Sequence, residues 1–286
     1  MAEILLSIIG ISAIAAIPAQ SVVLGLNTGR PYFKELLSQK SLLARFTITM
    51  FVIIPAVVIL FSFITGNLIN IWSAVLIISV APASPGVIKN MRKLEGDQNV
   101  STAWMILTMI LSLIFFPLIL LSLEKYLDID LKLGISDVLI KLMLLFIFPM
   151  SIGFLISKYF QGKAEILKKI LIPLSKVAMI TLIISLLISS VPMIISKGMI
   201  PVILLLSFII VSLTIAHLMG SPGNEFGPIL PYSIILRLPA PAVILTKLNN
   251  TMEIHLPVII SYTILAAIVM MVYNKIFFRE KRFETI

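Results

Sequence analysis

Long apolar runs are the feature of this sequence that most limits what it can fold into. An α-helix needs roughly 17 to 25 apolar residues to cross the hydrocarbon core of a bilayer, and nine runs of about this length follow one another along the chain. They cover approximately residues 3–26, 42–64, 71–90, 99–122, 136–157, 168–190, 199–219, 227–247 and 256–278. The connections are too short for a soluble domain, so residues 1–286 are predicted to form a single polytopic, all-α membrane domain.

The composition excludes a water-soluble protein. Hydrophobic residues make up 59% of the chain and charged residues 12%, about half the charged fraction of a typical soluble domain. The sequence has no cysteine, which excludes disulfides, thiolate metal sites and thiol nucleophiles. The pI of about 9.8 is therefore interpreted as a sign of membrane topology, with the lipid bilayer as partner and no nucleic acid.

Basic residues orient the predicted spans, because Lys and Arg accumulate on the cytoplasmic side of a membrane. Fifteen of them fall on one side of the nine-span topology and five on the other. The larger group comprises Arg30, Lys34, Lys40, Arg45, Lys89, Arg92, Lys93, Lys158, Lys163, Lys168, Lys169, Lys275, Arg279, Lys281 and Arg282. This asymmetry predicts a plasma-membrane protein with its N-terminus outside and its C-terminus in the cytoplasm. Lys176, within the sixth span, is expected to reach toward the inner face.

This topology assigns Arg237 to neither side of the membrane. Arg237 stands in the stretch "SIILRLPAPAVILTKL", whereas all thirteen acidic residues fall in connections or near span ends. An ionisable residue at membrane depth is costly and usually faces a cavity or a binding site. Two other roles stay open: Arg237 could cap carbonyls freed by a break in its helix, or extend to water.

Two spans are interrupted by proline. Span 71–90 contains Pro82, Pro85 and Gly86, and span 227–247 contains Pro239 and Pro241. Interior proline removes an amide donor and clashes with the preceding turn, so the backbone is predicted to open at Pro82–Gly86 and at Pro239–Pro241. Two broken spans, five spans apart and hence opposite in direction, are typical of an inverted-repeat transporter whose site lies where the breaks cross.

Three stretches resemble the bile acid:sodium symporter family. "VLIISVAPASPGVIKNMRKLEGDQNVSTAW" and "AHLMGSPGNEFGPILPYSIILRLPAPAVILTKL" are similar to its two crossing segments, and "SVVLGLNTGRPYFKELLSQ" to the loop after its first shared helix. The resemblance implies a core domain built on crossed helices near 71–90 and 227–247. It also implies a panel domain, here helices 3–64 and 136–190 in part. Nine spans would correspond to members that lack an extra first helix.

The chain departs from the sodium-coupled members at the positions that would bind the ion. Ser233 stands where they carry a glutamate, and Asn90 and Met91 stand where they carry Ser-Asn. Sodium coupling is therefore doubtful, and no other cofactor or metal is expected. The candidate cation-binding residues are Ser233, Asn90, Ser101 and Thr102, with Ser84 and backbone carbonyls as further oxygens.

The resulting hypothesis is a secondary transporter that moves an amphipathic organic anion, a carboxylate or sulfonate, by alternating access. Its candidate substrate-binding residues are Arg237, Pro239, Ala240, Ser84, Pro85, Gly86 and Lys89, with Gln20 and Asn27 able to face the site from the end of the first span. A membrane sensor of the same fold is the alternative. An intramembrane enzyme is not expected, because the sequence has no HExxH motif, no cysteine and no mid-span aspartate pair.

Overall fold

The computed structural model describes residues 2–27, 30–66, 68–93, 98–127, 135–196, 198–221, 226–248 and 251–277, and within them it contains helices and no strand. The first half contains α1 (Ala2–Leu26), α2 (Arg30–Ser38), α3 (Lys40–Ile48), the π-helical turn η1 (Thr49–Ile53), α4 (Ile54–Thr65), α5 (Ile69–Ser79), α6 (Gly86–Lys93) and α7 (Gln98–Leu127). The second half contains α8 (Ile135–Leu142), the π-helical turn η2 (Met143–Ile147), α9 (Phe148–Tyr159), α10 (Gln161–Ser196), α11 (Ile200–Gly220), α12 (Ile229–Ile235), α13 (Pro239–Leu248) and α14 (Met252–Phe277).

Five helical stretches of the described chain are long and apolar enough to cross a membrane. They are Lys40–Thr65, Asn99–Ile119, Leu139–Tyr159, Ile200–Gly220 and Met252–Phe277. Large apolar side chains such as Phe63 and Ile64 are exposed on these helices, as expected for surfaces that face lipid. The prediction of an all-α membrane protein is confirmed, whereas nine crossings and an inverted repeat stay predictions.

The two predicted interruptions are present, and the second lies earlier than expected. Between α5 and α6 the helix stops at residues 80–85, and between α12 and α13 it stops at residues 236–238. The opening predicted at Pro239–Pro241 was wrong by three residues, because Pro239 begins α13. Proline suits the first helical position, where its fixed φ fits and no amide donor is needed.

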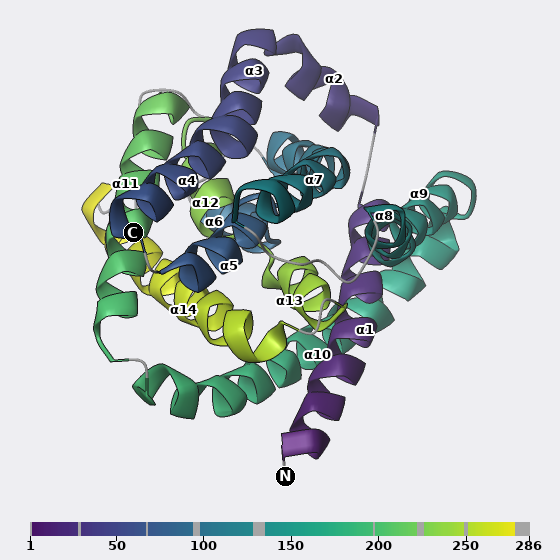
Figure 1. The fold of residues 1–286 in the computed structure, drawn as a ribbon. Coiled ribbons are helices and arrows are strands. Elements are labelled where there is room, and N and C mark those ends of the chain that lie inside the picture. Colours follow the sequence, from purple (N-terminus) through teal and green to yellow (C-terminus); the bar gives the residue numbers. More distant parts are fainter. Residues whose placement is uncertain are drawn as a thin grey trace.

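The helices form two groups (Figure 1). α1, α8, η2, α9 and α10 pack on one another and are called the flanking group below. The crossed segments α5–α6 and α12–α13 lie among α3, η1, α4, α7, α11 and α14, and this set is called the crossing bundle. Residues 40–65 pack in the crossing bundle, since α4 lies on α5 and α11. The division into core and panel domains stays a prediction.

Two glycines allow α1 and α9 to touch backbone to backbone. A Cβ atom at Gly25 would lie 2.0 Å from the carbonyl oxygen of Met150, and one at Gly153 would lie 2.2 Å from that of Val22. Small residues of this kind let helices approach closely in membranes. The flanking group is therefore held together at a contact that no larger residue could make without moving a helix.

Candidate functional site

The two interruptions are hydrogen-bonded to each other through their backbones. The amide of Ser84 donates to the carbonyl of Leu236 at 2.9 Å, and the amide of Leu238 donates to the carbonyl of Pro82 at 2.9 Å. These bonds make Ala83 and Arg237 an antiparallel pair. Backbone groups released from the two helices thus satisfy one another at the crossing, which lipid could not do.

Polar side chains of α7 satisfy two further groups of the first interruption. The hydroxyl of Ser112 donates to the carbonyl of Val80 at 2.8 Å, and the amide of Ala83 donates to the hydroxyl of Thr108 at 3.2 Å. Thr108 and Ser112 are one helical turn apart, so both hydroxyls lie on the same face of α7. Both side chains are buried. α7 therefore fixes the open backbone from one side.

Arg237 holds the open backbone of the crossing from the other side. The side chain is only 3% exposed. Its Nε donates to the carbonyl of Ile234 at 3.1 Å, its Nη1 to that of Ala81 at 2.8 Å, and its Nη2 to that of Met50 at 3.2 Å. All three acceptors are backbone carbonyls. Among the roles left open by the sequence, this geometry favours the cap on freed carbonyls.

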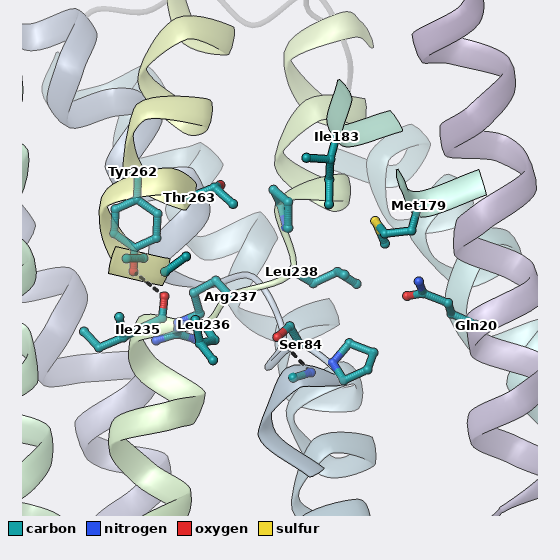
Figure 2. Close-up of a pocket in the computed structure, with 15 residues that line it drawn as sticks. Gln20, Ser84, Met179, Ile183, Ile235, Leu236, Arg237, Leu238, Tyr262 and Thr263 are labelled. Carbon is teal, nitrogen blue, oxygen red and sulfur yellow. Dashed lines mark hydrogen bonds between the residues drawn. The ribbon is translucent and has the colours of Figure 1, made fainter. Parts of the chain in front are cut away.

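Tyr262 of α14 binds free carbonyls at the second interruption. Its hydroxyl lies 3.2 Å from the carbonyl of Ile234 and 3.2 Å from that of Ile235, and the two carbonyls share its single proton. These are the last two carbonyls of α12, where an intact helix would have continued its own hydrogen bonding. Figure 2 shows Tyr262 above this end of α12, beside Arg237.

An aliphatic cavity of about 280 Å³ opens between the crossing and the flanking group (Figure 2). From the crossing it is lined by residues 84–86 and 235–239, and from the flanking group by Gln20, Met179 and Ile183. Tyr262 and Thr263 of α14 close a third side. Apart from Arg237, whose bonds are directed into the protein, the described lining has no charged side chain, so this cavity suits an apolar group.

A second cavity of about 490 Å³ adjoins the first and has a basic lining. The two cavities share Gln20, Pro85 and Gly86. Lys89 and Arg92 of α6 and Lys176 of α10 enter the second cavity, with Asn27 and Ser175 as further polar residues. No acidic residue is found among the described residues that line it. A cavity lined by three basic side chains suits an anion.

The candidate substrate-binding residues fall into three places. Ser84, Pro85, Gly86 and Pro239 line the aliphatic cavity, Lys89 lines the basic cavity, and Ala240 is fully buried in α13. Arg237 lines the aliphatic cavity, and each of its three side-chain nitrogens already donates to a backbone carbonyl. The two amides after Pro85 also have partners, because that of Gly86 donates to the hydroxyl of Ser84 and that of Val87 to the carbonyl of Ser84.

The candidate cation-binding side chains are buried or bonded within the protein. The hydroxyl of Ser233 donates to the carbonyl of Ile229 at 2.6 Å and accepts a bond from the indole of Trp104 at 3.0 Å. The amide nitrogen of Asn90 donates to the carbonyl of Gly86 at 2.8 Å. Ser101 and Thr102 are buried in α7. No group of three or more His, Cys, Asp or Glu side chains suited to a metal occurs in the described parts of the chain.

Several residues that shape the site were missed by sequence reasoning. Thr108, Ser112 and Tyr262 support the interruptions, Met50 supplies a carbonyl to Arg237, and Arg92 and Lys176 enter the basic cavity. The spacing of Thr108 and Ser112 in an apolar span was the one signal that could have identified support from α7. Arg92 and Lys176 were interpreted only as signs of topology.

Comparison with known proteins gives one family. Residues 22–197 match the model described as the Sodium Bile acid symporter family, a range that covers more than half of the chain and includes α5, α6 and α7. A search of the curated proteins found no match. The match covers the first interruption and α10, and it begins within α1, after Gln20.

Proposed function

The chain belongs to the sodium bile acid symporter family, and on this premise we propose that it is a secondary transporter of an amphipathic organic anion, moved by alternating access. A symporter family is one of membrane transporters, so the chain is not expected to be an enzyme. The proposal concerns the substrate class and the residues that bind it, since family membership alone does not fix either.

The adjoining cavities carry the proposal. The anionic group of the substrate binds Lys89, Arg92 and Lys176, and its apolar part lies against the aliphatic cavity beside Met179 and Ile183. Arginine and lysine both bind carboxylate and sulfonate oxygens, arginine in a bidentate manner. A substrate that spans both cavities passes Gln20, Pro85 and Gly86, where the crossing faces the flanking group. Movement of one group against the other would expose this position to either side in turn.

The test is counterflow in sealed vesicles that contain the purified protein. Vesicles loaded with an unlabelled bile-acid sulfonate should accumulate the labelled compound from outside, and an uncharged alcohol of the same ring system should neither accumulate nor compete. Lys176→Gln should reduce uptake at low substrate concentration about tenfold or more, as expected for one lost charged contact of about 1.5–3 kcal/mol. Lys169→Gln, on the same helix but outside both cavities, should transport normally.

Two outcomes would contradict this proposal. Saturable binding without accumulation would identify a membrane sensor of the same fold. Equal uptake by Lys176→Gln and Lys169→Gln would remove the basic cavity from the substrate path.

Sodium dependence is expected to be weak or absent. Ser233 replaces the carboxylate of the sodium-coupled members and is already bonded to Ile229 and Trp104, so an ion would lack its usual charged ligand. Uptake should therefore be similar in sodium and potassium buffers of equal ionic strength. A steep loss of uptake when potassium replaces sodium would show this expectation to be wrong.

A further inference from the structure

Three backbone carbonyls from three separate segments converge on the guanidinium of Arg237. Ala81 belongs to the first interruption, Ile234 to the end of α12, and Met50 to the π-helical turn η1. Ala81 and Met50 are 156 and 187 residues from Arg237 in the sequence. The guanidinium therefore joins η1 and the two broken helices.

Carbonyl oxygens that surround a common space can bind a cation. Each carbonyl oxygen carries partial negative charge, and unwound backbone carbonyls coordinate monovalent ions in several transporter folds. No carboxylate is bonded to Arg237 among the described residues. Three neutral oxygens favour a monovalent cation over calcium or magnesium, which are usually bound through carboxylates. Without the guanidinium, the carbonyls of Ala81, Ile234 and Met50 would face the space that it occupies.

We propose that Arg237 is a resident cation, a covalently attached charge that takes the place of a mobile monovalent ion and holds the crossing closed without one. The guanidinium suits this role because its donors diverge in a plane and stay charged, so one side chain reaches three carbonyls in different directions. A neutral residue at position 237 should leave the carbonyls in place without a cation. That variant should acquire an ion dependence that we do not expect of the native chain.

The experiment measures thermal unfolding of purified protein in sodium chloride, potassium chloride and choline chloride at equal ionic strength. The native protein should unfold at the same temperature in all three salts. Arg237→Gln should unfold at a lower temperature in choline, and sodium or potassium should raise its midpoint in a concentration-dependent manner, by about 2–4 °C or more. Choline is too large to enter a site made by three carbonyls.

Tyr262→Phe is the matched control. It removes a neutral donor from the carbonyls of Ile234 and Ile235, so it should lower the midpoint equally in the three salts. The proposal is overturned if Arg237→Gln shows no difference between sodium or potassium and choline, if it fails to fold when prepared in sodium, or if sodium stabilises the native protein. No substrate is present, so the outcome is independent of the transport proposal.

Discussion

The crossing and the contact between α1 and α9 bring backbones together in opposite ways. At the crossing, helices stop, and the released amides and carbonyls are paired with each other and with polar side chains of α7, α14 and Arg237. Between α1 and α9 both helices continue, and the approach depends on the missing Cβ atoms of Gly25 and Gly153. The first contact is electrostatic and the second is steric.

This difference indicates which substitutions each region can tolerate. In lipid an unpaired backbone group costs several kcal/mol, so the crossing depends on donors and acceptors that cannot be deleted singly. The glycine contact has no polar partner to lose, and it is sensitive only to added volume. Substitutions that remove atoms should therefore damage the crossing, and substitutions that add atoms should damage the flanking group.

The largest effect is expected for Arg237→Ala in sodium-free choline buffer. The change leaves the carbonyls of Ala81, Ile234 and Met50 without their charged donor, and bonds to charged groups contribute about 1.5–3 kcal/mol each. Unfolding free energy should fall by about 3–5 kcal/mol, since the three losses are not fully additive. Tryptophan fluorescence during thermal unfolding measures this change. A loss below about 1 kcal/mol would show that the crossing does not depend on this donor.

A smaller effect is expected for Gly153→Ala. The added methyl group would lie 2.2 Å from the carbonyl oxygen of Val22, and a backbone atom cannot give way as a side chain can. We expect a loss of about 3 kcal/mol, near the upper end of typical overpacking costs, from the same unfolding measurement. Gly162→Ala is the control, because a Cβ atom there meets nothing within 4 Å. Similar midpoints for the two variants would contradict the steric account.

Thr108→Val tests the crossing at a single neutral bond. Valine keeps the shape but removes the acceptor of the Ala83 amide, so unfolding free energy should fall by about 1–2 kcal/mol. Thr214→Val removes a hydroxyl that bonds only within its own helix, to the carbonyl of Ile210, on an exposed face of α11. That control should be near neutral. Equal destabilisation by both variants would indicate a general effect of valine in these helices.

The smallest effect is expected at a charge outside the membrane. Lys168 donates to the carboxylate of Glu165 at 2.9 Å, and this bond lowers the pKa of Glu165. Its contribution exists above the unfolded-state pKa and disappears as pH falls through the folded-state value. Because the carboxylate is exposed to solvent, Glu165→Gln should unfold at the native temperature at neutral pH. A clear shift would mean that the end of α10 is more coupled to the fold than its exposure suggests.

Local features of the sequence determined the membrane class, the helical character and the presence of two breaks. Span length and proline act on the chain within a few residues, so the interruptions near Pro85 and Pro239 could be predicted from the sequence. The same local reasoning identified Arg237 as out of place and Lys89 as a candidate substrate-binding residue. It placed the second opening three residues late because it treated Pro239 as a helix breaker rather than a helix start.

The tertiary structure alone decided what the unusual residues contact. Whether Arg237 binds a solute or caps carbonyls depends on Ala81 and Met50, more than 150 residues away in the sequence. Likewise, Lys176 lines one cavity together with Lys89 and Arg92 because α10 lies beside α6. Hydrogen bonds and cavities depend on distance in space, and apolar periodicity does not encode which distant segments become neighbours.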